Sequence, residues 1–143
     1  GASEAYRFLA EAYLGLGRTA EALEMVQQAL ALAHPASAAE NGRAWRVLGH
    51  VARDSGEAVQ AVDGDPNSYD PSECFCKSND YFGELNLGRD RAITLWRWAQ
   101  YEMTQENVAV GEEMWQEARM LFDQINLPFF VAWMERDREK AKK

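Results

Sequence analysis

The chain's best candidates for ligand binding are four basic side chains that recur at helical spacing: Arg43, Arg46, His50 and Arg53. Their intervals of three and four residues place them on one face of a helix. The stripe is unexpected because the chain carries 15 Lys and Arg against 23 Asp and Glu, a formal net charge of −8. Arginine makes forked contacts with carboxylates and phosphates. The stripe therefore predicts either a site for an anionic ligand or acidic peptide, or a solvated face whose charges pair with nearby acids such as Glu40 and Asp54.

Two other groups of residues have the chemistry of a metal site without its spacing. One segment alternates oxygen-bearing side chains as the start of an EF-hand calcium loop does: Asp63, Asp65, Asn67 and Tyr69. Ser68 then stands where that loop needs glycine, and Cys74 stands where it needs a bidentate glutamate. The thiols of Cys74 and Cys76, with two histidines in the whole chain, match no zinc-ligand spacing. We expect a polar turn, reduced thiols, and neither metal nor cofactor.

Arrangements typical of catalysis are also missing from the sequence. It contains no Ser-His-Asp or Cys-His set, no glycine-rich phosphate loop and no HExxH motif, so we expect no enzymatic activity and no catalytic residues. The acidic balance disfavours nucleic acid as a partner. No apolar run reaches about 18 residues and no leader resembles a signal peptide, so we expect no membrane partner and a cytoplasmic location.

Helical segments must position these residues, and the periodicity of apolar side chains predicts where they lie. We expect one all-α domain over residues 1–143, an α-solenoid of about three antiparallel helical hairpins with a C-terminal capping helix. Its predicted parts are repeat one at 3–36, repeat two at 41–87, repeat three at 88–125 and the capping helix at 128–141. Repeat two contains an insertion at 57–71, where turn-forming residues interrupt the helical pattern.

A near-copy of one segment, displaced by 40 residues, supports this repeat architecture. The segment YFGELNLGRDRAITL beginning at Tyr81 returns as LFDQINLPFFVAWME beginning at Leu121. A fixed period of this size is typical of stacked repeats, because one helical hairpin is too small to bury its own apolar face.

Three segments carry an alternation of large and small residues that resembles the tetratricopeptide repeat (TPR). The matching residues are Tyr6, Leu9, Ala10, Tyr13, Gly17, Ala22 and Ala29 in the first copy, Trp45, Leu48 and Gly49 in the second, and Leu95, Trp98, Ala99, Gly111 and Ala118 in the third. The segment GRAWRVLGHVAR and the 40-residue echo are also similar to the helical arrays found C-terminal to ATPase or nucleotide-cyclase modules in large bacterial signalling proteins.

The TPR resemblance implies a concave groove lined by the first helix of each repeat. It assigns the basic stripe to this groove, together with Trp96, Gln100 and Met103 from repeat three. Trp96 and Trp98 cannot both face inward on one helix, so Trp96 is expected to be an exposed aromatic anchor. The implied function is a protein-interaction module that binds a protein, peptide or helix, with an acidic peptide as one candidate. The alternative is a structural or regulatory segment that positions a catalytic domain. Terminal helices of such arrays expose apolar surface, so self-association near residues 129–133 is a further expectation.

Overall fold

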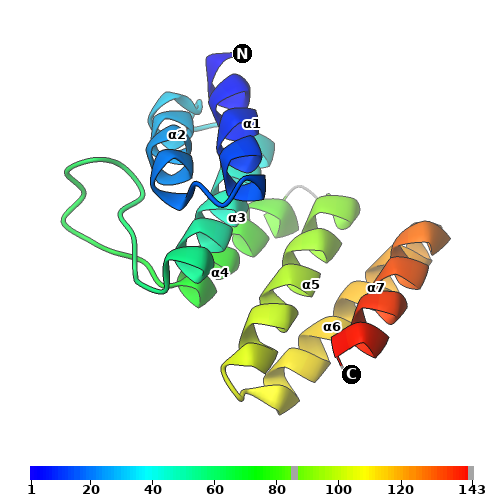
Figure 1. Ribbon diagram of the computed structural model, residues 1–143. Helices are drawn as coiled ribbons and strands as arrows, with labels where there is room; N and C mark the ends of the chain where they lie inside the picture. The colour runs from blue at the N-terminus through cyan, green and yellow to red at the C-terminus, as the bar shows by residue number, and fades with distance from the viewer. Residues whose placement is uncertain (85–86, 142–143) are drawn as a thin grey trace. The chain divides into compact units, whose positions relative to one another are not determined.

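The computed structural model describes residues 1–84 and 87–141, and these residues fold into helices joined by short turns and one longer loop (Figure 1). Within this part of the chain there are seven helices: α1 (Ala2–Gly15), α2 (Thr19–Leu32), α3 (Ala38–Ser55), α4 (Pro71–Glu84), α5 (Gly88–Thr104), α6 (Val108–Gln124) and α7 (Pro128–Ala141). Consecutive helices pack as antiparallel hairpins, α1 with α2, α3 with α4, and α5 with α6. The predicted all-α architecture of helical hairpins is confirmed.

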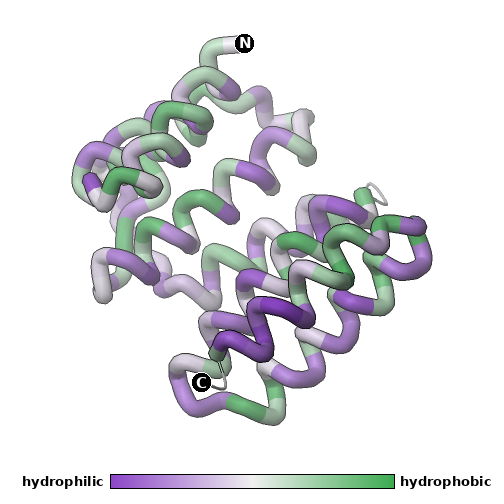
Figure 2. Tube along the Cα trace, turned by 45° about the vertical axis from the view of Figure 1, so that its right-hand side comes forward, coloured by the Kyte–Doolittle hydropathy of each residue, from purple (hydrophilic) through white to green (hydrophobic). Residues whose placement is uncertain are grey.

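The chain divides into two compact units, Gly1–Asn86 and Leu87–Lys143. The division falls at the border between the predicted repeats two and three. Each unit has its own apolar core, supplied by the inward sides of α1 to α4 in the first and of α5 to α7 in the second. Hydrophobic and hydrophilic residues alternate along the helices accordingly (Figure 2), as expected for helices with one buried face.

Glycines on α3 allow this helix to lie close to the rings of α4. A Cβ atom added at Gly49 would come within 2.8 Å of the Phe75 ring, and one added at Gly42 within 2.7 Å of the Phe82 ring. Both rings are fully buried. The Leu-Gly pair that carries the TPR resemblance therefore has a direct packing reason, since α4 fills the space that a side chain on α3 would need.

Local signals set several helix ends. Gly17 and Gly56 adopt left-handed φ angles of 73° and 74° at the ends of α1 and α3, a conformation that glycine accepts without steric cost. At the start of α4, Asp70 Oδ1 accepts a hydrogen bond from the Glu73 backbone N–H at 2.8 Å, and Glu73 Oε1 accepts one from the Asp70 N–H at 3.1 Å. This reciprocal capping box, followed by Pro71 at the first helical position, fixes where α4 begins.

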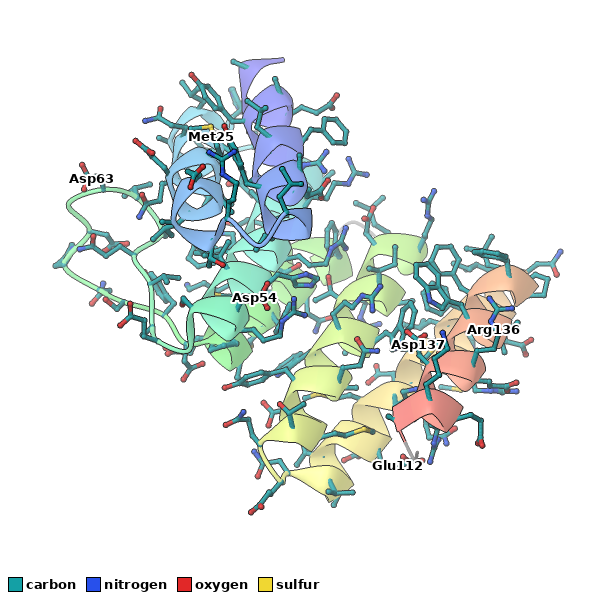
Figure 3. The ribbon with its side chains drawn as sticks, in the orientation of Figure 1. Met25, Asp54, Asp63, Glu112, Arg136 and Asp137 are labelled. Carbon is teal, nitrogen blue, oxygen red and sulfur yellow. The ribbon has the colours of Figure 1, made fainter. Side chains whose placement is uncertain are left out.

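The predicted insertion is the longest stretch without helix, and it extends from the first unit as a loop with Asp63 in its outward part (Figure 3). Val59 and Tyr69 close its base by donating N–H groups to each other's carbonyls at 3.0 and 2.8 Å. Asp65 Oδ1 accepts from the Asn67 N–H at 2.9 Å, which is the polar turn that the sequence predicts. Val59 and Ala61 are nevertheless buried in the first core, so the loop is anchored and does not merely project.

Because Cys74 is buried, the free energy of unfolding of the first unit is expected to fall at alkaline pH. Its side chain is fully buried, and this burial, with the nearby carboxylates of Asp70 and Glu73, raises the pKa of the Cys74 thiol to about 12. An unfolded cysteine loses its proton near pH ~8.5. Above that pH the unfolded state binds fewer protons than the native state, so the free energy of unfolding falls as pH rises, by up to ~1.4 kcal/mol per pH unit.

We therefore expect Cys74→Ala to remove part of the alkaline loss of stability. Urea unfolding at pH 8 and pH 10 measures this, and the wild type should lose about 1–2 kcal/mol more than the variant over that interval. Cys76→Ala is the matched control, because Cys76 is exposed and its thiol contributes less. Equal pH dependence in the wild type and Cys74→Ala would count against the buried, protonated thiol.

Candidate binding site

The residues predicted to form a groove are distributed over both units. The four basic residues lie on α3 in the first unit, and Trp96, Gln100 and Met103 lie on α5 in the second. Because the two groups belong to different units, the contacts of each group are described separately.

The basic residues of α3 are engaged with neighbouring groups. Arg53 is exposed, and its Nε donates to Asp54 Oδ1 at 2.9 Å. This pair lies at the C-terminal end of α3, where Figure 3 labels Asp54. The guanidinium of Arg46 lies 5.5 Å from the centre of the Phe82 ring, and His50 lies edge-on to Phe75 at 5.4 Å. Arg43 is half-buried and also interacts with its surroundings. These contacts support the interpretation of the stripe as a paired, partly solvated face.

A buried arginine on α1 pairs with two other acids near the stripe, Glu40 and Glu11. Arg7 is only 6% exposed, and its Nε donates to Glu40 Oε1 at 2.9 Å while its Nη1 donates to Glu11 Oε1 at 3.3 Å. Its position joins α1 to the start of α3. Because charged groups that are buried must be paired, we assign Arg7 to packing of the first unit.

The prediction that Trp96 is an exposed anchor is wrong. Trp96 is 1% exposed, whereas Trp98 is half-buried at the margin of the same core. The physical reason is α7, whose Trp133 ring lies edge-on to Trp96 at a centroid distance of 5.0 Å. Trp45 and Trp115, at 8% and 5% exposure, are core residues.

Aromatic rings hold α7 against the α5–α6 hairpin. Phe130 stacks on Phe122 of α6 with centroids 4.6 Å apart and planes 7° apart, and Phe130 and Trp133 are 5.9 Å apart. Offset-stacked and edge-to-face arrangements of this kind are the favourable ones for aromatic pairs. They fix the first two turns of α7, while Phe129 remains 66% exposed at its beginning.

Beyond this aromatic contact, α5, α6 and α7 enclose a pocket of about 420 Å³. Its lining residues are Trp96, Gln100, Met103 and Thr104 of α5, Trp115 of α6, and Asp137, Arg138 and Ala141 of α7. The three groove residues predicted on α5 therefore do share one site. Two indole rings and a thioether form its walls, and the polar groups lie around them, a composition typical of ligand pockets of this size.

Arg138 lies in the wall of this pocket and contacts Trp115 and Glu112. Its guanidinium lies 4.3 Å from the centre of the Trp115 ring, and its Nη2 donates to both carboxylate oxygens of Glu112 at 2.8 and 2.9 Å. Its charge is thus largely neutralised within the unit. Asp137, the next residue, lines the same pocket, while Arg136 extends from another side of α7 (Figure 3).

Sequence reasoning missed the contribution of α7 to the site. The charged end of this segment indicated a polar cap, yet Asp137, Arg138 and Ala141 continue the helical face begun by Phe130 and Met134. The 40-residue echo contained the signal, because it makes α7 the counterpart of α5. A helix equivalent to α5 is expected to pack beside it, and so to cover Trp96.

Comparison with known proteins assigns no family: no protein-family model and no curated protein sequence matches this chain. Among residues 1–84 and 87–141, none of the helices combines the length and apolar content needed to cross a membrane. The function must therefore be inferred from the geometry of the chain's own residues.

Proposed function

We propose that this chain is a protein-interaction module that binds a peptide or helix by receiving one large apolar side chain in the α5–α7 pocket. The observation that carries this proposal is the pocket itself, in which Trp96, Met103 and Trp115 form apolar walls beside polar groups. Interfaces draw most of their affinity from a few aromatic or aliphatic anchors that fill such pockets.

The rim is suited to a polypeptide ligand. Thr104 and Ala141 are exposed, so the pocket can be reached from solvent. The carboxylate of Asp137 offers acceptors for backbone N–H groups of a bound segment. The Thr104 hydroxyl already donates to the Tyr101 carbonyl at 2.6 Å and accepts from Gln105 Nε2 at 3.3 Å, which leaves it one lone pair. Gln100 Oε1 already accepts from Arg97 Nη1 at 3.0 Å, which orients its amide and leaves the NH₂ group to donate.

The helical-repeat arrangement supports the same function. The pocket lies between α5 and α7, which occupy equivalent positions in the 40-residue period. Between such helices, repeat proteins of stacked hairpins present extended binding surfaces. The resemblance to TPR domains, stated above from the residues, points to protein recognition as well.

We expect Thr104→Trp to weaken peptide binding at least 10-fold, because an indole placed at the rim occupies the volume that the ligand's side chain needs. The probe is an array of 12-residue peptides that each carry one Leu, Phe or Trp, in neutral and acidic backgrounds. Affinities of the selected peptides are then measured by fluorescence anisotropy for the wild type and the variant.

Glu113→Trp is the matched control, because Glu113 is exposed on α6 and lies outside the pocket lining. It introduces the same side chain and should leave peptide affinity unchanged. Arg46→Glu on α3 tests the basic stripe in the same assay. Peptides that bind the wild type and Thr104→Trp equally would rule out the pocket as the recognition site.

A further inference from the structure

Within residues 1–84, the outer side of α1 carries an apolar stripe that remains exposed, although the guanidinium of Arg7 on the same helix lies over one face of the Phe8 ring, 4.5 Å from its centre. Four residues within an arc of about 100° form it: Ala5, Phe8, Leu9 and Ala12. All four are exposed, with Phe8 at 54% and Leu9 at 47%, and Leu16 at the end of the helix is 70% exposed. The arc holds no charged residue. Isolated exposed apolar residues are ordinary, but a continuous stripe along a helix marks an interaction surface.

Internal similarity shows what kind of surface this is. The residues that occupy the same positions of the repeat on α3, 39 positions further on, are Ala44, Val47, Leu48 and Val51. Their exposed fractions are 0%, 4%, 0% and 0%, and they share a core with residues of α1 and α2. The stripe on α1 is therefore a face built to pack against another helix.

The order of side-chain sizes in the stripe is symmetric. Small residues at Ala5 and Ala12 flank the large pair Phe8 and Leu9, and the pattern reads the same from either end. A two-fold axis beside the middle of α1 would place Ala5 opposite Ala12 of a second copy. It would also bring Phe8 beside Phe8, and Leu9 beside Leu9, on the two flanks of the stripe at the centre of the contact. Small residues let the helices approach closely, and the large ones fill the centre. Such self-complementarity is what an isologous interface requires.

We infer that a second copy of this chain occupies the face, through antiparallel pairing of α1 with α1. This inference is independent of the peptide pocket, which lies in the other unit. A helix of 14 residues is about 21 Å long, so the contact falls below the ~1,200 Å² typical of stable complexes and the dimer should be weak. We expect it to form between about 10 μM and 1 mM.

The charges beside the stripe predict how ionic strength affects this dimer. Glu4 and Glu11 lie along one edge of α1, and antiparallel pairing brings Glu4 near Glu11 of the second copy. Glu11 also forms an ion pair with Arg7 Nη1 at 3.3 Å. Because like charges repel and salt screens them, dimerisation should strengthen as ionic strength rises.

Sedimentation equilibrium of the full chain at several concentrations tests the inference. Phe8→Glu should weaken self-association at least 10-fold, since it places a charge in the centre of the contact. Phe129→Glu is the control, because Phe129 is as exposed at 66% but lies on α7. Circular dichroism verifies that both variants fold. A chain that stays monomeric to about 1 mM, or loses its dimer through Phe129→Glu instead, overturns the proposal and leaves a helix of another protein as the occupant.

Disulfide formation tests the antiparallel register. In a Cys76→Ser background, which removes the exposed native thiol, Ala5→Cys and Ala12→Cys chains should cross-link when mixed. Ala5→Cys alone should not, because two copies of this position lie about 10 Å apart along the helix axis and a disulfide spans at most ~6.8 Å between Cα atoms. Cross-linking of Ala5→Cys with itself, and not with Ala12→Cys, would overturn the antiparallel pairing.

Discussion

Replacing Trp96 with alanine should reduce the free energy of unfolding of the C-terminal unit by about 3–5 kcal/mol. Trp96 is among the largest fully buried side chains of the chain, and its ring contacts Trp133 at 5.0 Å and Phe122 at 6.5 Å between centroids. The variant loses this buried surface and leaves a cavity between α5 and α7. Urea unfolding followed by circular dichroism at 222 nm measures the loss without depending on tryptophan fluorescence.

Trp98→Ala is the matched control, because it removes the same side chain two residues away on the same helix. Trp98 is half-buried and donates its indole N–H to Glu102 Oε1 at 3.2 Å, so its removal should cost about half as much or less. A larger loss for Trp98 than for Trp96 would mean that the exposed-anchor prediction was right and that α7 does not cover this face.

Gly111→Leu should reduce the free energy of unfolding by about 3 kcal/mol. Gly111 lies where α6 crosses α5, and a Cβ atom there would come within 2.7 Å of Met103 Cγ and 3.0 Å of the Ala99 carbonyl oxygen. The Met103 side chain can move, but the Ala99 carbonyl belongs to the helix backbone. Any side chain at this position therefore forces the two helices apart, and denaturant unfolding will report the cost.

Gly83→Leu provides the comparison, because Gly83 is helical, exposed and has no atom within 4 Å of its added Cβ. At such an open site, leucine favours helix over glycine by up to ~1 kcal/mol. The two replacements should thus change stability in opposite directions. If Gly111→Leu were as stable as the wild type, the close approach of α5 and α6 would not exist.

Local chemistry decided much of the fold, and it can be read from particular residues. Gly17 and Gly56 stop α1 and α3 because few other residues accept their left-handed conformation. Pro71 begins α4 and Pro128 begins α7, since proline suits a first helical turn. Each of these effects depends only on residues close by in the chain, so the predicted hairpins and capping helix agree with the structure.

Tertiary packing decided which faces of those helices are buried. Helical periodicity showed only that Trp96 and Trp98 cannot both face inward, and the TPR resemblance assigned the exposed position to Trp96. The position of α7 buries Trp96 instead. The same packing made a pocket from Gln100 and Met103 on α5 together with Asp137 and Arg138 on α7, residues 34 or more positions apart in the chain.

By itself, then, the sequence determined the seven helices, their order and their pairing in hairpins, because propensity, caps and period are properties of short segments. Only the tertiary structure decided that Arg7 is buried with Glu40, that Trp96 lies inside, and that Phe8 and Leu9 of α1 are exposed. The physical reason is that burial depends on which other helix packs against a face, and the periodicity of a helix does not specify that neighbour.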